Sequence, residues 1–199
     1  SDDSDEFINK ICEKLKSTFL PIIEHTVESK FSAILATVSE IKDMVFERQQ
    51  HSIQVDARLD ALEQYSRRNN LRLFGIKECS NENPDQLAIE VIQQKLNVNI
   101  ELRDIDRSHR VGLPRDGKSR AILIKFVSYR LRAEVFKKKK LLKGTHYSIK
   151  EDLTKSRLSL LQEAASRYGG HNVWSYDGRV MVNYKNKKVS IQTASDFPK

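Results

Sequence analysis

The sequence predicts an α+β protein in which a long N-terminal coiled coil precedes a mixed body of helices and strands. Three observations predict this fold class. A heptad repeat of apolar residues runs through residues 31–62, and no glycine occurs before Gly75. Alternating apolar residues then indicate strands and two helices between residues 70 and 150. A further helix and a β-hairpin are expected within residues 151–199.

The heptad repeat favours a coiled coil over an amphipathic surface helix. One seam position holds Phe31, Val38, Val45, Ser52 and Leu59, and the position three residues later holds Ile34, Ile41, Arg48, Val55 and Leu62. Eight of these ten residues are apolar. The rest of the chain offers few helices to cover such a seam, so we expect self-association. The residues expected at the interface are Ile34, Val38, Ile41, Val45, Val55, Leu59 and Leu62, with Arg58 and Glu63 at the flanking g and e positions.

Proline sets the expected start of the long helix. It is tolerated in the first helical turn but breaks a helix interior, so Pro21 predicts a helix from there to about Ser66. At about 1.5 Å per residue this helix is a rod of roughly 70 Å. Residues 1–20 are expected to form a short, separate acidic and amphipathic segment, and residues 21–66 the coiled coil. Arg48 and Ser52 either set the register and oligomeric state or mark a solvated patch.

The body at residues 70–150 is predicted to follow the order β-α-β-β-α-β. The predicted strands are Leu71–Ile76, Asp104–Val111, Ala121–Val127 and Tyr147–Lys150, and the predicted helices are 84–96 and Ser128–Leu142. This split βαβ, ferredoxin-like order occurs in RNA-recognition motifs and in many unrelated domains. In residues 151–199 we expect a helix capped at Asp152 or Thr154, a hairpin that turns at Asp177-Gly178, and a short last strand.

Charge divides the chain into two parts. Residues 1–63 carry 7 Lys+Arg and 13 Asp+Glu, a net charge of −6, whereas residues 64–199 carry 28 and 14, a net charge of +14. A basic body indicates polyanion binding, and nucleic acid is favoured over an incidentally basic surface. The chain has no apolar run of 18 residues, which argues against a membrane role. The two cysteines, Cys12 and Cys79, fit a reducing compartment.

Catalytic signals are missing from the sequence. It has no Walker loop and no G-x-S-x-G motif, and its five histidines lack metal-ligand spacing. We therefore expect no enzyme activity, no cofactor, no metal site and no small-molecule substrate. A bZIP-type DNA reader is disfavoured because its basic region precedes the zipper, whereas here the basic residues follow the coil.

The junction Leu62–Ile76, LEQYSRRNNLRLFGI, resembles the first open-reading-frame proteins of LINE-type retrotransposons. In that family a coiled coil enters an RNA-recognition-motif domain at this junction. The resemblance continues in Asp104–Val111, in Arg120–Phe126, in Lys150–Thr154 and in the hairpin Val173–Val180. It covers most of residues 58–196. The baculovirus FP (few polyhedra) proteins and their insect relatives have a similar layout and are the alternative identification.

The resemblance implies a trimer that binds nucleic acid. The family's coils carry an Arg-hydrophobic-x-x-hydrophobic-Glu trimer signature, which Arg58, Leu59, Leu62 and Glu63 match. Family members bind single-stranded RNA with little sequence preference, act as nucleic-acid chaperones and have no catalytic site. We therefore expect a homotrimer that binds single-stranded RNA, and also single-stranded DNA. We expect it in cytoplasmic ribonucleoprotein particles, with the nucleus as a further location.

Arg67 and Arg68 are expected to form a collar where three coils end. Three copies of this pair would converge there and guide a phosphate backbone, whereas a single arginine would suffice to complement the helix dipole. Asn69 and Asn70 suit a helix end with left-handed backbone geometry. A coiled-coil scaffold without a specific nucleic-acid role, and a baculovirus FP-like viral or insect structural protein, are the alternative functions.

The remaining contacts are expected in a basic cleft between the middle and last units. Sheet-surface stacking is doubtful, because Phe74 is the only candidate stacker and is equally well a core residue. Trp174 and Tyr176 are expected to pack within the hairpin. The full set of expected nucleic-acid contacts is Arg67, Arg68, Arg72, Arg107, Arg110, Arg120, Lys138, Lys139, Lys140, Lys150, Lys155 and Arg157. Backbone contacts of this kind give affinity without sequence reading.

Overall fold

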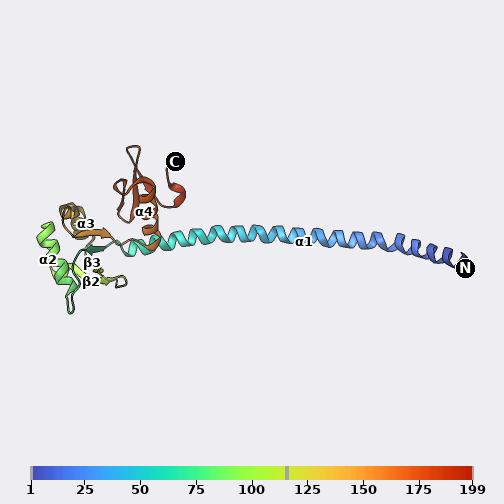
Figure 1. Ribbon diagram of the computed structural model, residues 1–199, viewed down its shortest axis with the longest axis horizontal. Helices are drawn as coiled ribbons and strands as arrows, with labels where there is room; N and C mark the ends of the chain where they lie inside the picture. The colour runs from blue at the N-terminus through green and yellow to red at the C-terminus, as the bar shows by residue number, and fades with distance from the viewer. Residues whose placement is uncertain (1, 115–116, 199) are drawn as a thin grey trace. The chain divides into compact units, whose positions relative to one another are not determined.

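The computed structural model describes residues 2–114 and 117–198, and it is an α+β protein with one long helix and two small antiparallel sheets (Figure 1). Packing divides the chain into one unit that ends at Ala57 and another that begins at Arg58. None of the helices in the described ranges is long and apolar enough to cross a membrane.

Helix α1 runs from Asp2 to Ser66, with Pro21 inside it. The expected helix start at Pro21 and the separate segment before it are therefore wrong. Proline lacks an amide donor and is therefore unfavourable inside a helix, but a helix can still contain one. Residues around Pro21 are exposed, so water can reach the carbonyl of Ser17, which is left without its usual partner. The seam residues Ile34, Val38, Ile41, Val45, Leu59 and Leu62 are all exposed in the single chain.

The first sheet contains four antiparallel strands in the order β2-β3-β1-β4. Its strands are β1 (Asn70–Phe74), β2 (Ile105–Val111), β3 (Ala121–Phe126) and β4 (Ser148–Glu151). Helix α2 (Pro84–Leu96) follows β1, and α3 (Tyr129–Lys138) follows β3. The predicted order of these elements is confirmed, and the predicted helix at 128–142 is an α-helix only to Lys138. A 3₁₀ turn, Lys139–Leu142, completes it, and another, Leu102–Asp104, precedes β2.

One face of this sheet packs against α2 and α3. Leu71 and Leu73 of β1 and Ile122, Ile124 and Phe126 of β3 are fully buried with apolar residues of both helices. Strand residues alternate between faces, so Arg72, Phe74, Leu123, Lys125 and Lys150 belong to the opposite face. The opposite face carries basic side chains on partly exposed strands.

The last part of the chain contains a helix and a three-stranded antiparallel sheet in the order β5-β6-β7. Its elements are α4 (Lys155–Tyr168), β5 (Val173–Tyr176), β6 (Arg179–Tyr184) and β7 (Lys187–Ile191), with 3₁₀ turns at Gly170–Asn172 and Ala194–Asp196. Thr154 caps α4, and the expected hairpin turn at Asp177-Gly178 is confirmed. A second small core forms around Ala164, Val180, Val182 and Ile191.

Candidate nucleic-acid interface

The buried carboxylate of Asp152 gathers the polar residues at the end of α1. It lies between β4 and α4 and is 3% exposed. Arg67 Nη1 donates to its Oδ1 at 3.2 Å, and Arg72 Nε donates to the same oxygen at 2.7 Å. Asn70 Nδ2 donates to Oδ2 at 3.0 Å. Three residues of the RRNNLR stretch therefore bind one carboxylate that lies about eighty residues further along the chain.

The last turns of α1 hold the segment between β4 and α4. Gln64 is buried; its Nε2 donates to the Asp152 carbonyl at 3.1 Å, and its Oε1 accepts from the Thr154 amide at 3.0 Å. Asp60 accepts from the Thr154 hydroxyl at 2.5 Å and from Arg157 Nε at 2.7 Å. Asp60, Gln64 and Arg67 share one helix face, since they are spaced by four and three residues. That face fixes the segment that links the four-stranded sheet to α4.

These bonds change the role of two expected phosphate contacts. Arg67 also forms an ion pair with Glu63 at 2.6 Å, and Arg72 is paired with Asp152. Both guanidinium groups therefore have structural partners, whereas Arg68, the other residue of the expected collar, has no carboxylate partner among the described residues. The expected left-handed backbone at Asn69 and Asn70 is wrong, because neither residue has a positive φ. Asn70 instead begins β1 and uses its side chain on Asp152.

A cavity of about 620 Å³ lies among the end of α1, α3, the start of α4 and the β5–β6 turn. We call it the arginine cleft. Its charged and aromatic lining includes four arginines and two tyrosines, namely Tyr65, Arg68, Tyr129, Arg132, Arg157 and Arg179. Asp177 is the one carboxylate among its described lining residues. Such a concave site combines donors for phosphate with aromatic rings for stacking.

The arginine side chains of the cleft differ in how many interactions they already form with other residues of the chain. The Arg68 guanidinium lies 3.9 Å from the centre of the Tyr65 ring. Arg157 bonds to Asp60 and to the Gly178 carbonyl. Arg132 is buried and bonds to Glu151 at 2.7 Å, but its Nε has no partner. The Arg179 side chain is exposed and forms no hydrogen bond or ion pair with any residue of the described ranges, so it is available to a ligand.

Tyr129 and Asp177 connect the two sides of the cleft. The Tyr129 hydroxyl donates to Asp177 Oδ1 at 3.0 Å. Burial raises the pKa of the Tyr129 hydroxyl, and the hydrogen bond to the Asp177 carboxylate raises it further. The hydroxyl therefore stays protonated at neutral pH and acts as a donor.

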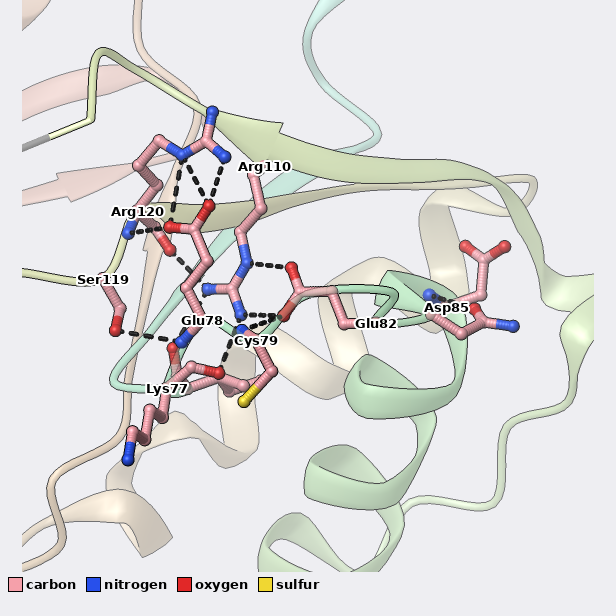
Figure 2. A network of polar contacts seen from close by, with 10 residues as sticks. Lys77, Glu78, Cys79, Glu82, Asp85, Arg110, Ser119 and Arg120 are labelled. Atoms are coloured by element: carbon pink, nitrogen blue, oxygen red, sulfur yellow. Dashed lines mark hydrogen bonds and ion pairs between the residues drawn. The ribbon is translucent and has the colours of Figure 1, made fainter.

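A second group of expected contacts does not line the cleft. These residues belong to a structural network of polar contacts (Figure 2). Arg110 has a side chain only 5% exposed; it pairs with Glu82 at 2.7 Å and donates to the carbonyls of Ile76 and Arg120. Arg120 forms an ion pair with Glu78. Figure 2 shows these side chains joining the loop after β1 to the strands β2 and β3. Both guanidinium groups therefore have structural carboxylate partners, which compete with the phosphate contacts expected of Arg110 and Arg120.

The Glu78–Arg120 pair predicts a defined pH dependence of stability. The hydrogen bond from the Arg120 guanidinium to the Glu78 carboxylate lowers the pKa of Glu78 from 4.5 to about 2. A lowered folded-state pKa stabilises the fold above the unfolded value and loses that effect as pH falls through the folded value. The difference in unfolding free energy between wild type and Glu78→Gln should therefore shrink between pH 4.5 and about 2. Urea unfolding at stepped pH tests this, and a difference that stays constant would contradict it.

The remaining expected contacts lie outside the arginine cleft. Lys138 pairs with Glu134 and donates to the Asn97 carbonyl, and Lys139 lies 3.6 Å from the centre of the Phe136 ring. Burial lowers the pKa of Lys139. Arg107, Lys140, Lys150 and Lys155 are exposed. These four, with Arg68, remain available, and Lys150 also lies over the half-buried Phe74.

Sequence reasoning missed Tyr65, Tyr129, Arg132 and Arg179. Arg179 directly follows the Asp177-Gly178 turn, so its position in the hairpin could be predicted from the sequence. The cleft beside the hairpin could not be predicted, because its other residues come from α1, α3 and α4. Of the two hairpin aromatics expected to pack, Trp174 is half-buried and Tyr176 is exposed. No protein-family model matches the chain, and a search of curated proteins finds no significant match. No described group of histidine, cysteine and acidic side chains has the arrangement of a metal site.

Proposed function

We propose that this protein binds single-stranded RNA, and also single-stranded DNA, as a homotrimer with little sequence preference. The observation that carries the proposal is the arginine cleft, with its four arginines and two tyrosines. Guanidinium groups bind phosphates, and aromatic rings stack on bases of any sequence. The exposed Arg107, Lys140, Lys150 and Lys155 extend the positive surface. We propose binding alone and no catalytic activity.

The order of the elements supports a finer proposal about the fold. An antiparallel sheet in the order β2-β3-β1-β4 with two helices on one face is the ferredoxin-like arrangement of RNA-recognition motifs. With the coil before it and the small α/β domain after it, this layout resembles the first open-reading-frame proteins of LINE-type retrotransposons. We infer the corresponding role of a nucleic-acid chaperone that coats retrotransposon RNA in cytoplasmic or nuclear ribonucleoprotein particles.

The end of α1 supports self-association next to the cleft. Leu59 and Leu62 are exposed, whereas Gln64 is buried on a different side of the same helix. In the heptad register, Leu59 and Leu62 occupy a and d, and Asp60 and Gln64 occupy b and f. A coiled coil could therefore continue to Leu62 without displacing the segment between β4 and α4, which Asp60 and Gln64 hold. Trimerisation would place three clefts at one end of a coil.

Binding of single-stranded RNA should be tight at low salt and should weaken steeply as salt rises. Each phosphate contact contributes a slope of about −0.7 in log K against log salt for a single strand. Fluorescence anisotropy with a labelled RNA of mixed sequence measures this dependence, and sedimentation equilibrium measures the mass. The double variant Leu59→Glu and Leu62→Glu should abolish the trimer. Glu40→Gln, at an exposed position outside the seam, should leave it intact.

A scaffold without a nucleic-acid role gives a different result. It would remain trimeric and show no salt-dependent affinity for RNA, which would reject the proposed function. A monomer that binds RNA would reject only the trimer. Duplex DNA of the same length is the comparison ligand, and it should bind more weakly because its bases cannot reach the aromatic rings.

A further inference from the structure

The arginine cleft contains one group that a phosphate site does not need. Asp177 is a carboxylate, and it lies among four arginines. A carboxylate repels a phosphate and accepts hydrogen bonds from N–H groups. Besides its place in the hairpin turn, this carboxylate suits an N–H group of a ligand rather than a backbone phosphate.

The position of Asp177 is fixed from several sides. Asp177 and Gly178 both have positive φ, of 49° and 73°, as the hairpin turn requires. The Gly178 amide donates to Glu151 at 3.2 Å, and its carbonyl accepts from Arg157 at 2.9 Å. A Cβ at Gly178 would lie 2.7 Å from Gln64 Cγ, so the turn packs directly on α1. The turn is held before any ligand arrives.

The Asp177 carboxylate is oriented by a hydrogen bond and still has an oxygen that can accept another. The Tyr129 hydroxyl donates to Oδ1 at 3.0 Å, while Oδ2 accepts no hydrogen bond from any residue within 2–114 and 117–198. Beside it, the exposed Arg179 side chain forms no hydrogen bond or ion pair in those ranges. The cleft thus offers one acceptor next to several donors, with aromatic rings from Tyr65 and Tyr129.

A nucleobase has the complementary set of groups. Each of the four bases carries at least one N–H donor and one acceptor on its Watson–Crick edge, and in a duplex that edge is occupied by pairing. A single acceptor with nearby donors therefore accepts any base, provided that the base is unpaired. The volume of about 620 Å³ is ample for one base.

We propose that the arginine cleft holds one unpaired nucleobase of the bound strand and that Asp177 accepts a hydrogen bond from its Watson–Crick N–H. This inference rests on the proposed function and deepens it. Stacking on tyrosine and the surrounding arginines supply affinity for any base. Asp177 makes the site selective for single strands, since the hydrogen bond that it needs is absent from a paired base.

The test compares two ligands and two variants of the full chain. One ligand is a mixed-sequence RNA, and the other has the same number of phosphates on abasic ribose spacers. Asp177→Gly removes the carboxylate and keeps a residue that suits the positive φ of the turn. Tyr129→Phe is the matched control, because it removes the hydrogen bond to Asp177 but keeps both the ring and the carboxylate. Anisotropy titrations at one salt concentration measure all six affinities.

The proposal predicts opposite signs for the two ligands. Wild type should bind the RNA more tightly than the abasic strand. Asp177→Gly should weaken RNA binding roughly tenfold, as expected for loss of a hydrogen bond to a charged group. The same variant should bind the abasic strand as well as wild type or better, because a repelling charge has gone. Tyr129→Phe should bind RNA within about twofold of wild type, since stacking and the acceptor remain.

Other results overturn the proposal in distinguishable ways. If Asp177→Gly binds RNA more tightly, the cleft holds backbone only, and the proposed RNA binding stands without the base pocket. If wild type binds RNA and abasic strand equally, no base is read. If wild type binds neither ligand, the proposed function fails together with this inference. Circular dichroism of each variant verifies that the hairpin is still folded.

Discussion

Asp152→Ala is expected to lower the free energy of unfolding of the unit that begins at Arg58 by about 3 kcal/mol. The carboxylate is 3% exposed and accepts hydrogen bonds from Arg67, Arg72 and Asn70. Its removal leaves two partly buried guanidinium groups without their shared counter-charge. Breaking such a pair costs more than the pair contributes, because the remaining charge is poorly solvated. The value is at the low end of the usual range because both arginines are about 30% exposed.

A surface ion pair provides the control for this prediction. Asp106 pairs with Lys125 at 2.9 Å, and both side chains are more than a third exposed. Asp106→Ala should therefore change the unfolding free energy far less than Asp152→Ala does, because water and salt screen an exposed pair. Urea unfolding followed by circular dichroism measures both variants under the same conditions. Equal effects of the two substitutions would show that Asp152 is not the centre of the junction.

The order of strands and helices in residues 70–199 could be predicted from the sequence because it depends on local periodicity. Leu71 and Leu73 alternate with Arg72 and Phe74, and this alternation marks a strand with one buried face. Asn83 and Pro84 mark the start of α2, where Asn83 accepts from the amides of Asp85 and Gln86. Asp177 and Gly178 have the chemistry of a hairpin turn. Each of these signals lies within a few residues of the feature that it predicts.

The roles of the arginines could not be predicted in the same way. Arg110 and Glu82 are 28 residues apart, and Arg67 and Asp152 are 85 apart. A sequence gives the sign of each charge but not which opposite charge folding brings within hydrogen-bond distance. A stretch such as RRNN therefore reads as a phosphate site, whereas Arg67 and Asn70 bind a carboxylate. The cleft residues come from α1, α3, α4 and the hairpin, and only the fold brings them together.

Pro21 shows the same limit for a local rule. The rule that proline begins a helix rests on the amide that it lacks and on the clash with the preceding turn. Both costs are small compared with the many hydrogen bonds of a helix from Asp2 to Ser66. The position of the proline therefore did not determine where the helix begins.

Arg179→Glu is expected to weaken single-stranded RNA binding about a hundredfold at low salt, because like charges placed together at an interface cost several kcal/mol. The Arg179 side chain lines the arginine cleft, is exposed and forms no hydrogen bond or ion pair with the described residues. Its substitution therefore breaks no interaction of the folded chain, and the change in affinity reports the ligand. The plot of log K against log salt should also become shallower, by about 0.7 for each phosphate that the variant no longer neutralises.

Arg103→Glu is the matched control for this variant. It makes the same change in net charge at an exposed residue outside the cleft, and within the described ranges Arg103 forms one ion pair, with the exposed Glu101. Anisotropy titrations across a salt series should show a loss of about twofold, since exposed charges beyond a Debye length of about 10 Å are screened. Equal losses for the two variants would mean that RNA responds to the overall charge of the body rather than to the cleft. A large loss for Arg179→Glu alone would locate the strand at the hairpin, because only the local field of the two variants differs.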